Sequence, residues 1–153
     1  MNLNYKQLGN GEPLIILHGL MGMLDNWMTL AKKFAEHYEV FALDARNHGR
    51  SDASIEFNYE VMSDDLLEFL AAKNITSANI IGHSMGGKTA MQFAQENPER
   101  VNKLIVADIG PKHYPVHHEK ILAGLRKVPL NSLEKRTDAD TYMQDDISEK
   151  GVR

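Results

Sequence analysis

The chain has 153 residues, of which 42% are hydrophobic and 25% are charged, values typical of a globular domain rather than a disordered chain. Its formal net charge of −4 argues against a nucleic-acid partner, and the absence of cysteine excludes disulfides and thiolate chemistry. The sequence shows no secretory signal pattern and no apolar run of membrane-spanning length, so we expect a cytoplasmic protein without a membrane partner.

Short apolar segments alternate with amphipathic ones along the first 110 residues. The strand candidates are a weak one at 3–8 and apolar runs at 14–17, 39–43, 78–81 and 104–107. Helix candidates lie between them: Asp25 and Asn58 can cap the first two, and Pro98 ends the third. This alternation predicts an α/β fold with a mostly parallel sheet and helices on both faces.

The pattern changes after Gly110. Residues 111–118 are irregular, and two polar helix candidates follow at 117–127 and 137–150. Neither continues the alternation of strand and helix. We therefore expect residues 1–110 to form the α/β core and residues 111–153 to form a separate helical part.

The segment Gly82-His83-Ser84-Met85-Gly86 joins an apolar strand candidate to a helix candidate. A serine at the apex of a sharp strand-to-helix turn is exposed and aimed, as a nucleophile elbow requires. The tight turn leaves no room for side chains at Gly82 and Gly86. The N-terminus of the following helix can stabilise a developing oxyanion. The segment therefore predicts a serine nucleophile at Ser84.

The same loop also fits the phosphate-binding pattern of Gly, four residues and Gly-Lys-Thr, with Gly82, Gly87, Lys88 and Thr89. Asp108, after an apolar run, could then hold magnesium. Nucleotide binding does not explain His18-Gly19-Leu20 after an earlier strand candidate, whereas a nucleophile elbow requires a second backbone donor there. We therefore favour the nucleophile elbow and keep a nucleotide-binding protein using Gly82–Thr89 as the alternative.

Three motifs together resemble the α/β-hydrolase fold superfamily: His18-Gly19, Asp-x-Arg-x-His-Gly-x-Ser at 44–51, and the Gly82–Gly87 loop. Within it, the chain is similar to the N-terminal part of small bacterial esterases of the YbfF type. The resemblance covers nearly the whole chain and implies a serine esterase or thioesterase for short-chain or acyl-CoA esters, with no cofactor and no metal. It also implies that residues 111–153 begin a helical cap, and that the chain ends before the last strands of the sheet.

The resemblance also assigns roles to residues. Ser84 is the nucleophile, and the backbone N–H groups of Leu20 and Met85 form the oxyanion hole. Asp108 is a candidate for the triad acid or for a group behind it. The chain order Ser, acid, His puts the base beyond Arg153, so we expect the catalytic histidine outside this chain and weak or no activity from the chain alone. The residues expected to shape the site are His18, Gly19, Gly82, His83 and Gly86.

The strand candidate at 101–107 ordinarily pairs with further strands in this fold, so we expect its edge to find a partner. That partner is either a second chain carrying the rest of the fold or a swapped copy of this one. A catalytically dead binding fragment is the alternative that the missing histidine favours. His117 and His118 beside Glu119 are more typical of a solvated surface than of a metal site, because adjacent residues rarely converge on one ion.

Overall fold

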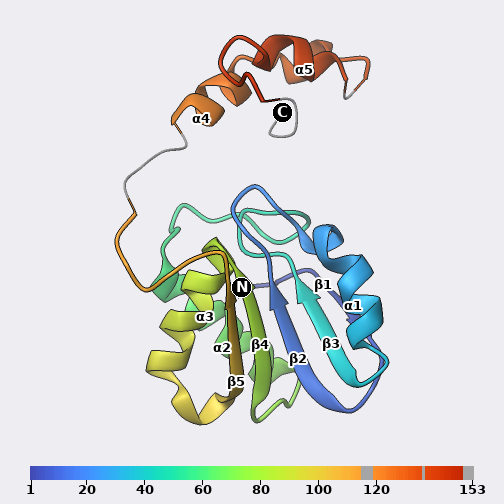
Figure 1. Ribbon diagram of the computed structural model, residues 1–153, viewed down its shortest axis with the longest axis vertical. Helices are drawn as coiled ribbons and strands as arrows, with labels where there is room; N and C mark the ends of the chain where they lie inside the picture. Colours follow the sequence, from blue (N-terminus) through green and yellow to red (C-terminus); the bar gives the residue numbers. More distant parts are fainter. Residues whose placement is uncertain (115–118, 136, 150–153) are drawn as a thin grey trace. The chain divides into compact units, whose positions relative to one another are not determined.

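A computed structural model of the chain describes residues 1–114, 119–135 and 137–149 (Figure 1). Contacts divide the chain into two compact units, Met1–Pro111 and Lys112–Arg153. The pair His117 and His118 lies outside the described residues. Across the described ranges, none of the helices is both long and apolar enough to cross a membrane.

A five-stranded sheet with the order β1-β3-β2-β4-β5 forms the centre of the first unit. The strands are β1 (Tyr5–Leu8), β2 (Glu12–Leu17), β3 (Tyr38–Leu43), β4 (Ala78–His83) and β5 (Val101–Ala107). β1 runs antiparallel to β3, and every other neighbouring pair is parallel. The predicted mostly parallel sheet is confirmed, and its carboxyl ends bring the loops after β2, β3, β4 and β5 to one edge.

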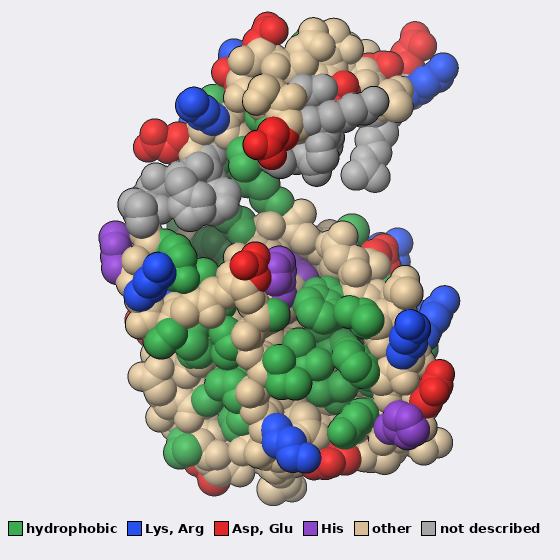
Figure 2. Space-filling view, viewed as in Figure 1, with side chains coloured by type: hydrophobic (Ala, Val, Ile, Leu, Met, Phe, Trp, Pro, Cys, Tyr) green, Lys and Arg blue, Asp and Glu red, His purple; other side chains and the backbone are tan. Residues whose placement is uncertain are grey.

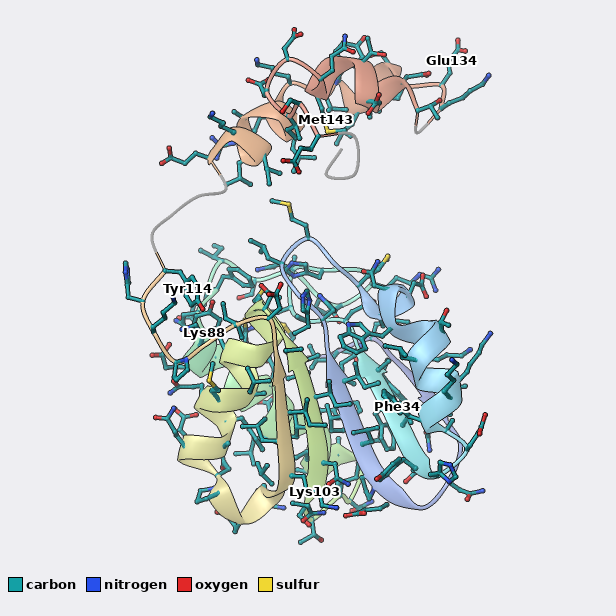
Figure 3. All side chains as sticks on the ribbon, viewed as in Figure 1. Phe34, Lys88, Lys103, Tyr114, Glu134 and Met143 are labelled. Atoms are coloured by element: carbon teal, nitrogen blue, oxygen red, sulfur yellow. The ribbon has the colours of Figure 1, made fainter. Side chains whose placement is uncertain are left out.

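Helices cover both faces of this sheet (Figure 1). They are α1 (Met28–Phe34) on one face, and α2 (Tyr59–Ala72) and α3 (Met85–Glu96) on the other. Leu14 and Ile16 of β2 pack in the same cluster as α1, which includes Phe34, labelled in Figure 3. Ile15 and Leu17 pack with α2 and α3. Residues 14–17 of β2 are all apolar because their side chains are buried alternately on opposite faces of the sheet.

The start of the first helix differs from the prediction. A 3-10 turn, η1 (Leu24–Trp27), precedes α1, and Asn26 Oδ1 rather than Asp25 accepts the N–H of Met23, at 2.7 Å. The Leu24 N–H donates instead to the Asp44 carboxylate, at 2.7 Å, so a contact from the loop after β3 fixes where the turn begins. Asn58 caps α2 as predicted, because its Oδ1 accepts the N–H of Val61 at 2.9 Å.

β5 is an outer strand of the described sheet, after a short 3-10 turn, η2 (Pro98–Arg100). Leu104 and Ile105 are 36% and 56% exposed. Figure 2 shows hydrophobic side chains gathered over the sheet between β5 and α1. The expectation that a second chain or a swapped copy covers this edge stays a prediction.

The second unit contains α4 (Glu119–Arg126), the 3-10 turn η3 (Leu130–Ser132) and α5 (Asp138–Met143). Its buried apolar side chains include Met143, labelled in Figure 3, and Ile147, which lies against Gly124 of α4. The helix predicted over residues 137–150 is shorter in the structure, where α5 ends at Met143. Aspartates at 145 and 146 are unfavourable at the negative end of a helix, and Asp146 pairs with Lys127 Nζ at 2.6 Å.

Candidate active site

Ser84 sits at the apex of the turn between β4 and α3, and it is partly exposed. Its backbone has φ 51° and ψ −113°, a combination that side-chain-bearing residues rarely adopt. The Ser84 N–H donates to Ala107 O of β5 (3.0 Å), and the Ser84 carbonyl accepts the N–H of Lys88 (3.0 Å). The neighbouring strand and the first turn of α3 thus hold the residue in its strained conformation.

Two glycines allow this turn to close. A Cβ added at Gly82 would lie 2.3 Å from Gly86 O, and one at Gly86 would lie 2.4 Å from Leu17 O. Both obstacles are backbone atoms, which cannot rotate away. The Gly86 N–H also donates to His18 O at 3.1 Å, so the elbow is tied to the end of β2.

The loop after β2 lies against the serine. A Cβ added at Gly19 would be 3.3 Å from Ser84 Cβ and 2.9 Å from His83 Nδ1. Within residues 1–114, no acceptor is found for the Leu20 N–H. Met85 is the first residue of α3, and the first N–H groups of a helix lack partners within it. The loop that carries Leu20 therefore lies beside Ser84, and Met85, with its N–H at the start of α3, directly follows it in the chain.

His18 is buried, with 1% of its surface exposed, and it joins two loops. Its Nε2 accepts the N–H of Ala45 (3.0 Å), and its Nδ1 lies 2.8 Å from Gly19 O. A ring nitrogen that accepts must be unprotonated, so His18 is neutral and carries its hydrogen on Nδ1. Burial lowers the pKa of His18, which favours the same neutral form. His18 is thus suited to shaping the loop that contains Gly19 and Leu20.

The loop after β3 is organised by Asp44, which is 1% exposed. One carboxylate oxygen accepts from Leu24 N–H (2.7 Å), and the other accepts from Asn4 Nδ2 (2.7 Å) and Arg50 N–H (3.0 Å). In the same loop, Asn47 has φ 62°. Asparagine tolerates this left-handed backbone better than most residues do.

Sequence reasoning missed the partner of Arg46. The Asp65 carboxylate, on α2, accepts a hydrogen bond from Arg46 Nε at 2.6 Å and a second from Arg46 Nη2 at 2.8 Å. Both side chains are buried. Hydrogen bonding to Asp65 raises the pKa of Arg46. A signal was present, since Asp65 is spaced three residues after Met62 and four before Phe69, on a buried face of α2 where a charge requires a partner.

Asp108 follows β5 with φ 56°, and its side chain is 89% exposed. Its Oδ2 lies 3.8 Å from His83 Nε2, and the His83 ring is 6.4 Å from the ring of Trp27. Asp108 and His83 therefore form one exposed group next to the elbow. In the described part of the chain, no histidine is hydrogen-bonded to Ser84 Oγ.

The phosphate-loop alternative does not fit this geometry. The Thr89 side chain, which would face magnesium, is 3% exposed and donates to Met85 O at 3.1 Å. The Gly86 N–H, which would face a phosphate, already donates to His18 O. The Gly82–Thr89 segment thus leaves Ser84 partly exposed, while two groups that a nucleotide would need are already hydrogen-bonded within the protein.

Acid is expected to destabilise the protein through His18. The unfolded residue titrates near its ordinary value of 6.5, whereas the folded residue titrates lower. Between these two values the unfolded chain binds more protons, so the free energy of unfolding should fall as the pH is lowered through this range. Urea titrations from about pH 7.5 to about pH 5.5 measure this slope, which should be smaller in His18→Gln. His37→Gln, at an exposed histidine, is the control; equal slopes in His18→Gln and wild type would contradict the assignment.

Comparisons with known proteins agree with this architecture. The family model described as alpha/beta hydrolase fold matches residues 12–140. A Haemophilus influenzae protein named as an esterase/lipase is 39% identical over 98% of this chain and 54% of its own length. Escherichia coli esterase YbfF is 37% identical over 94% of this chain and 57% of its own length. A solved marine microorganism esterase superposes with a TM-score of 0.94 at 43% identity, covering 98% of this chain and 60% of that one.

The chain thus spans little more than half the length of the curated relatives named above. Those relatives are named as esterases or lipases, and the resemblance drawn from the three motifs is confirmed. The matched residues include the whole sheet from β2 to β5 and the elbow at Ser84. The chain belongs to the α/β-hydrolase fold family.

Proposed function

We propose that the protein is a serine hydrolase that cleaves carboxylic esters or thioesters, with Ser84 as the nucleophile. The observation that carries this proposal is the strained, partly exposed Ser84 at the start of α3, lying against Gly19 of the loop after β2. The Leu20 and Met85 N–H groups are the proposed oxyanion donors. Strain of this kind persists only where the surrounding structure enforces it, and it recurs at catalytic turns. The esterase names of the relatives support the same reaction class.

In this mechanism, Ser84 Oγ attacks the acyl carbonyl carbon, and the carbonyl oxygen becomes an anion held by the Leu20 and Met85 N–H groups. A base takes the hydroxyl proton and passes it to the leaving alcohol or thiol as its bond to the acyl carbon breaks. Water then attacks the acyl-enzyme, releases the carboxylic acid and returns a proton to Ser84. The reaction as written uses no cofactor.

The base is the part of the mechanism that residues 1–114 do not supply at Ser84. We assign it to a histidine outside this chain, within the length of the relatives that the chain does not span. Asp108 is proposed as the acid that orients this histidine, or as a group behind that acid. Its exposed carboxylate beside His83 supports a place at the rim of the site.

An apolar acyl group, either short-chain or carried on coenzyme A, is the proposed substrate. Exposed apolar side chains of the loops that follow β2 and β3 support this choice, namely Leu20, Met21, Ile55 and Phe57. The Phe57 ring lies 6.0 Å from that of His48, which accepts the Met21 N–H, so these loops are joined. We also propose that residues 111–153, which contain the short helices α4 and α5, begin a helical cap.

A fluorophosphonate tests the nucleophile. Ser84 Oγ should displace fluoride from phosphorus, and intact mass followed by peptide mapping should locate the adduct on Ser84. Ser84→Ala should abolish this labelling, while Ser77→Ala, at a loop serine, should leave it unchanged. Turnover of p-nitrophenyl butyrate by this chain alone should be weak or absent, because residual catalysis without a triad base is only of order 10³ over water.

Each outcome is informative. Equal labelling of wild type and Ser84→Ala would reject Ser84 as the nucleophile. An unlabelled chain without turnover would mean that Ser84 is not activated in this chain, which agrees with a base supplied from outside it. Fast labelling together with fast turnover would reject the assignment of the base to a histidine outside this chain.

A further inference from the structure

Two histidines join the loops after β2 and β3 in a reciprocal way. His18, on the first loop, accepts the N–H of Ala45 on the second at 3.0 Å. His48, on the second loop, accepts the N–H of Met21 on the first through Nε2 at 3.2 Å. The two rings pack with their centroids 5.1 Å apart. Each loop therefore carries one histidine, and the ring of that histidine accepts a hydrogen bond from a backbone N–H of the other loop.

The second nitrogen of His48 anchors it to its own loop. His48 Nδ1 lies 2.9 Å from Arg46 O, and because Nε2 accepts, Nδ1 must carry the hydrogen and donate. The Arg46 side chain is in turn held by Asp65 of α2. His48 thus extends a rigid connection from a core helix to the loop that contains Leu20.

The peptide that His48 holds lies in a tight turn. Gly22 N–H donates to Gly19 O at 3.0 Å, and Met21 has φ 61°. Leu20 has no positive φ, so the turn is of type II, with Met21 at the position that normally requires glycine. Rotation of the Leu20–Met21 peptide would give a type I turn, which needs no left-handed residue. Since methionine is unfavourable at this position, an external contact must stabilise the type II form.

We infer that His48 is a positioning residue, which holds the Gly19–Gly22 turn in its type II form and so fixes the loop that presents the Leu20 N–H to the oxyanion. This inference rests on the proposed role of Ser84 and Leu20. His48 touches no reacting atom in this account. It acts through the Met21 amide, one residue beyond the proposed donor.

Three variants distinguish the effect of the His48 acceptor nitrogen from the effect of ring packing at this position. His48→Phe keeps a ring to pack against His18 and Phe57 but has no acceptor. His48→Gln keeps an acceptor, because Gln Oε1 can reach the position of Nε2. His37→Phe makes the same change at an exposed histidine and is the matched control.

The first readout is the amide hydrogen exchange of Leu20 and Met21, measured by NMR. The chemical shifts of the two His48 ring nitrogens report its tautomer in the same samples. Wild type should show the Nδ1–H tautomer of His48. Met21 exchange should be about tenfold faster in His48→Phe, matching the loss of one hydrogen bond, and close to wild type in His48→Gln and His37→Phe. The second readout is the rate of Ser84 labelling by a fluorophosphonate, which should fall about tenfold in His48→Phe and recover in His48→Gln.

Unchanged Met21 exchange in His48→Phe would overturn the inference, as would labelling of that variant at the wild-type rate. If wild type and Ser84→Ala are labelled equally, the proposed function fails, but exchange still decides whether His48 holds the turn. The two failures are therefore distinguishable.

Discussion

Replacing Asp65 with alanine is expected to lower the free energy of unfolding by about 3–5 kcal/mol, because it leaves the Arg46 charge buried without its carboxylate. Arg46 is 6% exposed and Asp65 is 3% exposed, so water cannot readily replace the missing partner. Arg46 also donates to Glu56 O (2.9 Å) and Val61 O (3.1 Å). The loss should therefore extend to the loop between β3 and α2.

Urea unfolding measures this effect, and the neighbouring Asp64 provides the control. Asp64 is exposed on the same helix, so Asp64→Ala should change stability by less than about 0.5 kcal/mol. The double variant Arg46→Met/Asp65→Leu removes both charges and should recover much of the loss. A loss in Asp65→Ala no larger than that in Asp64→Ala would show that the pair contributes little to stability.

The features of the fold that could be predicted are those in which neighbouring residues decide the structure. The apolar run at 14–17 predicts a strand because all four side chains are buried, on alternating faces. Gly82 predicts the elbow because a side chain there would meet the backbone of Gly86, only four residues further along. The Ser84 position therefore follows from local sterics.

Contacts between distant segments decided the features that were missed. The Asp25 cap was wrong because Asp44, 19 residues further along, takes the Leu24 N–H and shifts the start of the helix. The Arg46–Asp65 pair and the bond from Met21 to His48 likewise join residues separated by 19 and 27 positions. A motif can indicate that such residues belong to a site, but only the sheet order brings their loops together.

A methyl group at Gly86 should be more disruptive than one at the adjoining Gly87. In Gly86→Ala, the new Cβ would lie 2.4 Å from Leu17 O and 2.7 Å from His18 O, both backbone atoms at the end of β2. Relief requires α3 to move away from the sheet, which also breaks the Gly86 N–H bond to His18 O. We expect a loss of about 3 kcal/mol or more in the free energy of unfolding.

Gly87→Ala is the matched comparison, since it makes the same change one residue along the same turn of α3. Its closest obstacle is the Ile109 Cγ2 methyl at 2.6 Å, a side-chain atom on a partly exposed residue that can rotate aside. The loss should be about 1 kcal/mol, and urea unfolding of both variants measures the difference. Equal losses would mean that α3 moves easily against β2, and the contact between them could not then be what holds Ser84 in its strained conformation.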